Sequence, residues 1–98
     1  MTADPRDNAE QHRYELEVDG HVAYVVYRLQ DDVIKLVHTE VPKELGGRGV
    51  GSTLVRAVLE KVRAEGLKLA VTCPFVSAWM EKHPEFDDLL ATPRAQAG

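Results

Sequence analysis

A glycine-rich segment in the middle of the chain has the residue types and spacing that most clearly predict chemistry. Residues 46–53 read GGRGVGST, with four glycines among the first six positions. Glycine has no Cβ atom, so a ligand can approach the backbone closely. Because a helical pattern begins at Gly51, the segment also supplies amide N–H groups at the positive end of a helix dipole. Together with Arg48, these features predict a binding site for phosphate groups.

Two common nucleotide-binding motifs do not fit this segment. A P-loop has a lysine before its serine or threonine, whereas Gly51 is followed directly by Ser52. The dinucleotide-binding fingerprint G-x-G-x-x-G lies early in a βαβ unit, whereas this G-x-G-x-G pattern follows a third strand. The alternative is a simple turn in which Ser52 or Thr53 caps the helix. Since one or two glycines would suffice for such a turn, the composition favours anion binding.

The elements before this segment are predicted to be strands. Apolar patterns indicate strands at 14–18, 21–29 and 33–41, joined by tight turns at Asp19-Gly20 and Asp31-Asp32. The second strand is apolar at both alternating sets of positions, which predicts that both of its faces are covered and that it is central. The three strands would form an antiparallel meander.

After the glycine-rich segment the apolar spacing becomes helical. Leu54 to Val62 follow the spacing of a buried helical stripe, and Gly66 is placed to end that helix. A short apolar strand at 67–72 and a second helix that ends near His83 come next. This order predicts an α+β fold, an α/β sandwich in which helices pack on a mixed central sheet.

Composition limits the class of protein. The chain has 98 residues, and its 12 basic and 16 acidic residues give a net charge of −4, which argues against nucleic-acid and membrane-surface partners. Its one cysteine excludes an internal disulfide and a cysteine-rich zinc site. No secretory or membrane-spanning pattern is found, so we expect a cytoplasmic protein. We expect one domain at 13–90, a disordered arm at 1–12 and a flexible tail at 91–98.

The stretch VHTEVPKELGGRGVGSTLVRAVLE resembles the acyl-CoA-binding motif of the GCN5-related N-acetyltransferase (GNAT) superfamily. That motif reads Gln/Arg-x-x-Gly-x-Gly/Ala between a strand and a long helix. Gly49 and Gly51 match its glycines, while Gly46 stands where Gln or Arg is usual. The resemblance continues through TCPFVSAWMEKHPEFDDLL and is closest to the very small branch of NATD1-like and YjdJ-like domains. It covers about residues 13–90.

The resemblance implies a compact GNAT-like fold in which acetyl-CoA lies where the strands at 33–41 and 67–72 separate. The pyrophosphate would bind amides of the glycine-rich segment, and the pantetheine arm would pair with main chain like an added strand. Amides of the earlier strand would polarise the thioester carbonyl. The cofactor-binding residues expected on this basis are Glu40, Val41, Gly46, Gly47, Arg48, Gly49, Val50, Gly51, Ser52, Cys73, Pro74, Phe75, Val76 and Trp79.

Two side chains are candidates for catalysis, and matching residues in small relatives support both. Cys73 ends the strand beside the expected site, where a thiol can protonate the departing CoA thiolate or carry the acyl group. His38 has the imidazole of a general base, and its alternation places it on one face with Leu36 and Glu40. The alternatives are an inert buried thiol and a hydrogen-bonded strand histidine. For Trp79 the alternative to a channel wall is core packing.

We therefore expect an acetyl-CoA-dependent N-acetyltransferase that needs no metal and acts by direct attack of an amine in a ternary complex. Little chain is left outside 13–90 to enclose an acceptor, so we expect an open acceptor side suited to a protein, peptide or small amine. We expect neither nucleic-acid nor membrane partners, and a monomer or weak dimer. The alternatives are a non-catalytic acyl-CoA-binding or adaptor protein, and an interaction module whose glycine-rich segment is only a turn.

Overall fold

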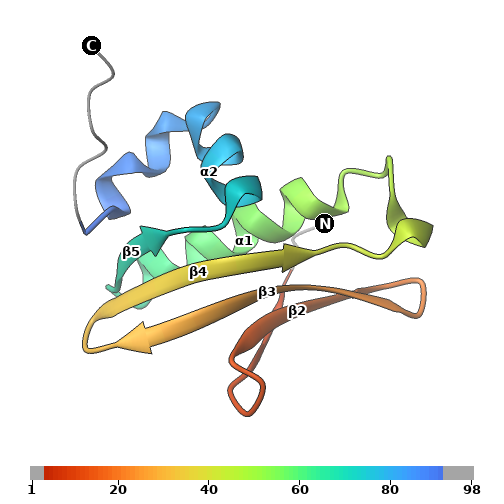
Figure 1. Ribbon diagram of the computed structural model, residues 1–98, viewed down its shortest axis with the longest axis horizontal. Helices are drawn as coiled ribbons and strands as arrows, with labels where there is room; N and C mark the ends of the chain where they lie inside the picture. Colours follow the sequence, from red (N-terminus) through yellow and green to blue (C-terminus); the bar gives the residue numbers. More distant parts are fainter. Residues whose placement is uncertain (1–3, 92–98) are drawn as a thin grey trace.

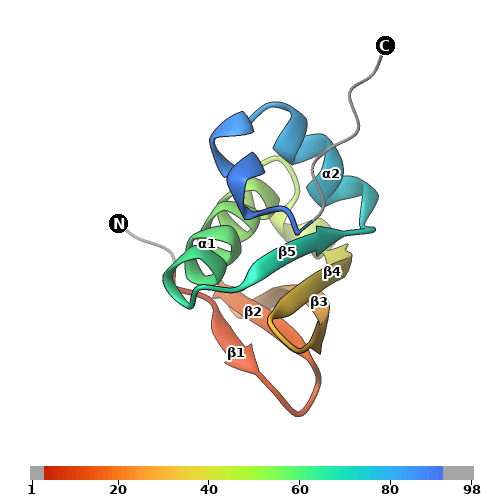
Figure 2. The same ribbon diagram turned by 90° about the vertical axis from the view of Figure 1, so that its left-hand side faces the viewer.

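The structure, a computed structural model, describes residues 4–91 as a five-stranded sheet with helices on one face (Figures 1 and 2). In sequence and spatial order the strands are β1 (Arg6–Asn8), β2 (Arg13–Val18), β3 (His21–Gln30), β4 (Val33–Glu40) and β5 (Lys68–Val71). The helices are η1 (Lys43–Leu45), α1 (Val50–Ala64), α2 (Pro74–Glu81) and η2 (Pro84–Leu89). Only β4 and β5 pair in parallel, so the sheet is mixed, as predicted. Within residues 4–91, no helix is long and apolar enough to cross a membrane.

The β2–β3 hairpin has the tight turn that its sequence predicts. Asp19 and Gly20 both have positive φ angles, 52° and 80°, as a type I′ turn requires. Val18 and His21 lie opposite each other immediately beyond the turn. The hairpin therefore fixes the position of Asp19 through strand pairing, a point that becomes important for the functional site.

A glycine ends α1 as predicted. Gly66 has a φ of 72°, and its N–H donates to the Arg63 carbonyl at 3.1 Å. The N–H of Leu67 donates to the Val62 carbonyl, also at 3.1 Å. These two bonds form a Schellman motif, which satisfies carbonyls of the last helical turn and directs the chain into β5.

The core lies between the helices and one face of the sheet. Both α1 and α2 lie on this face (Figure 2), and β3 is the middle strand. The prediction that both faces of β3 are covered is wrong: Val22 on the opposite face is 38% exposed. Charged side chains shield part of that face, since the Arg13 guanidinium lies 4.2 Å from the centre of the Tyr24 ring. The fully buried side chains of the core include Tyr14, Ile34, Leu36, Leu54, Leu59 and Leu69.

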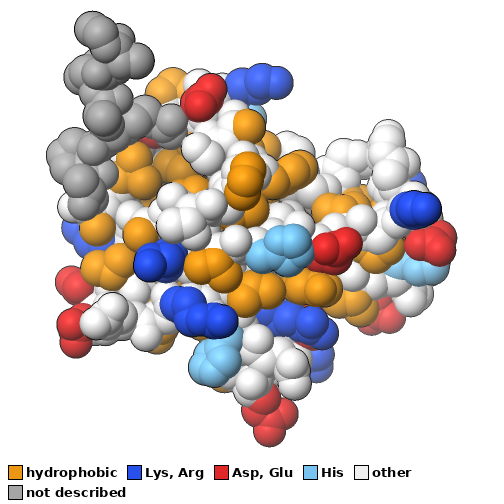
Figure 3. All heavy atoms as spheres, viewed as in Figure 1, with side chains coloured by type: hydrophobic (Ala, Val, Ile, Leu, Met, Phe, Trp, Pro, Cys, Tyr) orange, Lys and Arg blue, Asp and Glu red, His pale blue; other side chains and the backbone are white. Residues whose placement is uncertain are grey.

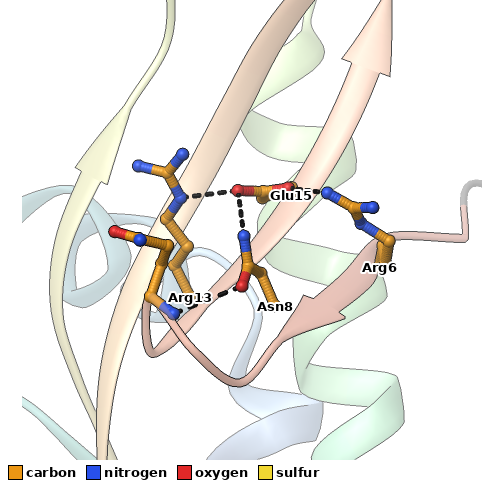
Figure 4. A network of polar contacts seen from close by, with 5 residues as sticks. Arg6, Asn8, Arg13 and Glu15 are labelled. Atoms are coloured by element: carbon orange, nitrogen blue, oxygen red, sulfur yellow. Dashed lines mark hydrogen bonds and ion pairs between the residues drawn. The ribbon is translucent and has the colours of Figure 1, made fainter.

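The predicted disordered arm contains a strand. Arg6–Asn8 pairs with β2, and its side chains hold the carboxylate of Glu15 (Figure 4). Arg6 and Arg13 each donate to Glu15 at 2.6 Å, and Asn8 donates at 3.0 Å. The contacts of Arg6 and Asn8 cross from β1 to β2, so local sequence patterns do not reveal them. Residues 1–3 of the predicted arm, and 92–98 of the predicted tail, lie outside the described residues.

Glu15 should make the stability of the fold dependent on acid pH. Its hydrogen bonds with Arg6, Arg13 and Asn8 lower its pKa from 4.5 to about 2. The stabilisation is therefore present above about pH 4.5 and is lost as the pH falls toward 2. Glu15→Gln should lower the free energy of unfolding at pH 7 by about 1–3 kcal/mol and flatten its dependence on pH in this range.

Urea unfolding at several pH values measures this effect. Glu17→Gln is the matched control, because Glu17 is an exposed carboxylate on the same strand and the same face. An unchanged pH dependence in Glu15→Gln would contradict the role given to this carboxylate.

Candidate functional site

The glycine-rich loop has a backbone that requires glycine at two positions. Gly47 and Gly49 have φ angles of 77° and 72°, in the left-handed region that disfavours residues with a Cβ. A Cβ at either position would meet nothing within 4 Å, so open space lies next to this backbone. Arg48 stands between them. The loop thus combines an accessible main chain with a cationic side chain.

The N-terminus of α1 is not capped by a side chain. Gly49 is the N-cap, and the first turn contains no acidic residue. The first bond of the helix runs from the Thr53 N–H to the Gly49 carbonyl at 3.0 Å, so the amides of residues 50–52 need partners outside the helix. The hydroxyl of Ser52 instead accepts a hydrogen bond from Trp79 Nε1 at 2.7 Å. The alternative in which Ser52 or Thr53 caps the helix is therefore wrong.

Gly51 has a different role, because it allows close packing. A Cβ here would lie 2.7 Å from Cζ of Phe75 and 3.4 Å from Cγ2 of Val41. The start of α2 and the residue that follows β4 therefore meet over the first turn of α1. The Phe75 ring is 44% exposed, so it covers Gly51 from the surface.

The residues of α2 that were predicted to bind the cofactor are divided between surface and core. A shallow depression of about 220 Å³ is lined by Phe75, Ala78, Trp79 and Lys82. Trp79 is otherwise buried, with its ring stacked on His83 at 3.7 Å between centres. Val76 is completely buried and offers no surface to a ligand. Most of the Trp79 side chain is therefore packed in the core, which was the alternative interpretation of this residue.

Strands β4 and β5 diverge beside this loop. Their pairing ends where Leu36 lies opposite Val71. The N–H groups of Thr72 and Cys73 then both donate to the Leu36 carbonyl, at 3.0 and 3.2 Å, as the chain turns into α2. Residues 37–40 of β4 extend beyond the end of β5, so β5 does not pair with this part of β4 (Figure 1). The divergence occurs between the two strands for which it was predicted.

A β-bulge changes which residues of β4 face the helices. Tyr27 lies opposite Leu36, but Val26 lies opposite His38, so Val37 is an extra residue. His38 consequently faces away from Leu36, and the prediction that they share a face is wrong. His38 Nε2 lies 3.0 Å from Oε1 of Glu40, and both side chains are exposed on the open face of the sheet.

The same bulge turns Thr39 toward Cys73. Their Oγ1 and Sγ atoms are 3.4 Å apart, which links β4 to the N-cap of α2 across the point of divergence. Cys73 is only 2% exposed. His38 lies on the other face of β4, so the two predicted catalytic residues do not form a cysteine–histidine pair. Thr39 was not predicted, because no local pattern in the sequence signals the bulge.

The tip of the β2–β3 hairpin contacts the glycine-rich loop. Arg48 Nη2 lies 2.7 Å from Oδ2 of Asp19. A second, longer contact joins His21 Nδ1 to Oε1 of Glu44 at 3.9 Å. The sequence analysis did not predict that Asp19 contacts the loop. Asp19 lies far from the loop in the sequence, and the tight turn that it forms with Gly20 already accounts for its presence.

Comparison with known proteins gives this geometry a family. A family profile described as GCN5-related N-acetyl-transferase matches residues 13–89. The chain belongs to this family. In this GNAT domain, the glycine-rich loop, the uncapped α1 and the diverging strands all lie within the matched residues.

Curated relatives and a solved structure agree with this assignment. Protein NATD1 from Gallus gallus and from Homo sapiens are each 36% identical to the chain over 52 residues. That match covers 53% of the chain and 47% and 46% of the two relatives, so the chain spans about half their length. The NMR solution structure of a GCN5-like protein from Staphylococcus aureus matches the GNAT domain over 97% of this chain and 93% of its own. Its TM-score is 0.71 at 28% sequence identity.

Proposed function

We propose that this GNAT domain binds acetyl-CoA and transfers the acetyl group to an amine. The observation that carries the proposal is the N-terminus of α1, which has no side-chain cap and no acid in its first turn, beside an open glycine-rich loop. A helix with such an end binds anions well, and the CoA diphosphate is an anion. Acetyl-CoA would supply a reactive thioester to this site.

The proposed site assigns binding to main-chain groups. The amides of residues 47–52 and the guanidinium of Arg48 would hold the diphosphate. Main chain at 37–41, beyond the last pairing with β5, would bind an extended pantetheine arm as an added strand. The partly exposed Phe75 ring lies beside both segments and would move to admit the arm.

Proton transfers are proposed to occur on the two faces of β4. The amine must lose a proton, and the CoA thiolate must gain one. His38, with Glu40 at 3.0 Å, lies on the open face and is proposed as the base for the amine. Cys73, positioned by Thr39, lies on the helix side and is proposed as the acid for the thiolate. Separation of the two groups would prevent them from neutralising each other before reaction.

The acceptor is proposed to approach the open face of the sheet. This face carries His38 and Glu40, and no helix within residues 4–91 covers it (Figure 2). Such an exposed surface suits an amine on a protein or peptide as well as a small amine.

Ligand-induced stabilisation tests the proposal. Acetyl-CoA and CoA should each raise the melting temperature, with a stabilisation of about 2.7 kcal/mol when the ligand is present at a hundredfold its Kd. Pantetheine, which lacks the diphosphate, should give a much smaller shift. Mass spectrometry of an amine panel with acetyl-CoA then detects transfer. A melting temperature that acetyl-CoA leaves unchanged would exclude the proposed function.

One observation favours a second candidate, a domain that binds acyl-CoA without efficient transfer. The Cys73 thiol is 2% exposed, and an acid must be able to reach the atom that it protonates. This candidate predicts saturable binding of acetyl-CoA with no acetylated amine and no acyl-Cys73 in the mass spectra.

A further inference from the structure

The guanidinium of Arg48 is already bound to a carboxylate within the chain. Its Nη2 atom lies 2.7 Å from Oδ2 of Asp19, and the two side chains are 48% and 66% exposed. Basic, acidic and histidine side chains gather at the end of the molecule where the β2–β3 hairpin meets the glycine-rich loop (Figure 3). The cation expected to contact phosphate therefore has an internal anionic partner.

The two partners differ in their freedom to move. Asp19 belongs to a type I′ turn, and the pairing of Val18 with His21 fixes that turn. Arg48 lies between Gly47 and Gly49, where open space surrounds the backbone and neither neighbour has a Cβ. When the ion pair breaks, Arg48 is the partner that can turn toward another anion.

We infer that Asp19 sets the affinity of the loop for phosphate groups by competing for Arg48. A diphosphate carries more charge and more acceptor oxygens than one carboxylate, so it can displace Asp19. Binding must nevertheless break the Arg48–Asp19 pair and bring negative charge close to the Asp19 carboxylate. The inference rests on the proposed function, because it deepens the account of the same site by adding a residue that tunes affinity.

Isothermal titration with CoA tests the inference on four variants of the whole chain. Asp19→Asn removes the charge and keeps the turn, because asparagine tolerates a positive φ. The matched control is Asp31→Asn, which removes one charge from another positive-φ turn residue, in the β3–β4 turn at the far end of β3. Arg48→Gln and the double variant Asp19→Asn/Arg48→Gln measure whether the effect passes through Arg48.

We expect Asp19→Asn to bind CoA about two- to fivefold more tightly at low ionic strength, the range typical of an exposed ion pair. Asp31→Asn should bind as the parent does, and the gain should vanish when Arg48 is replaced. Equal or weaker binding by Asp19→Asn, or a gain that persists without Arg48, would overturn the competition while leaving the proposed function intact.

Inorganic pyrophosphate separates the two failures. If the parent binds pyrophosphate but not CoA, and Asp19→Asn again binds more tightly, the competition holds and the proposed function fails. If no variant binds either ligand, both are overturned.

Discussion

Replacing Cys73 by alanine is expected to lower the rate of acetyl transfer at least about a hundredfold, while CoA affinity changes less than about twofold. The reason is that the proposed acid is lost, whereas the loop proposed to hold the diphosphate is a different segment of the chain. Alanine fills most of the space of the buried cysteine, so the fold should persist. Steady-state kinetics and isothermal titration on the same preparation measure the two quantities.

Thr39→Val and Cys73→Ser sharpen this test. Valine keeps the shape of threonine but removes the hydroxyl 3.4 Å from the thiol. The rate of acetyl transfer in Thr39→Val should therefore fall less than in Cys73→Ala, by about tenfold. The serine hydroxyl can still donate a proton but is a weaker acid than a thiol. The pH dependence of the transfer rate of Cys73→Ser should therefore differ from that of the parent. If Cys73→Ala turned over at the parental rate, the proton would come from another source, such as bound water.

Placing an acid in the first turn of α1 is expected to weaken CoA binding at least about tenfold without destabilising the fold. Thr53 is exposed, and an aspartate there would lie near the amides proposed to hold the diphosphate. The same charge interacts favourably with the helix dipole, by about 0.3–1 kcal/mol. Affinity and stability should therefore change in opposite directions, a result that misfolding does not produce.

Thr53→Asn is the control for shape, and it should bind CoA nearly as the parent does. Titration calorimetry at low and high salt should show that the penalty in Thr53→Asp shrinks as salt increases. This design is sharper than replacing Gly49 with valine, because Gly49 has a positive φ and valine would distort the loop by itself. Equal affinity in Thr53→Asp and Thr53→Asn would contradict diphosphate binding at α1.

The sequence predicts most of the fold because its signals are local. Apolar patterns predict β2, β3 and β4, Asp19-Gly20 predicts the first hairpin, and a helical stripe predicts α1. Strand β1 was missed, since three polar residues become a strand only by pairing with β2 and holding Glu15. The 3-10 helix η2 was also missed. Its buried residues are Phe86 and Leu89, and two buried positions are too few to form a recognisable helical pattern.

The candidate site likewise contains features that local sequence patterns predict and contacts that they do not. The glycine-rich loop is visible in the sequence, because its glycines are adjacent and precede a helix. The contacts of Thr39 with Cys73 and of Arg48 with Asp19 join segments that are distant in the chain. The face of His38 depends on how β4 pairs with β3, so simple alternation along β4 gives the wrong answer.

The extra residue at Val37 acts as a phase shift in the pleat of β4. Before Val37, the even-numbered side chains of β4 pack in the core. After Val37, the even-numbered side chains face outward, and the hydroxyl of Thr39 contacts the thiol of Cys73. A strand of uninterrupted pleat would turn the imidazole inward in place of that hydroxyl. Main-chain geometry therefore decides whether the thiol lies beside an alcohol or beside an imidazole, with the same side chains available in either case.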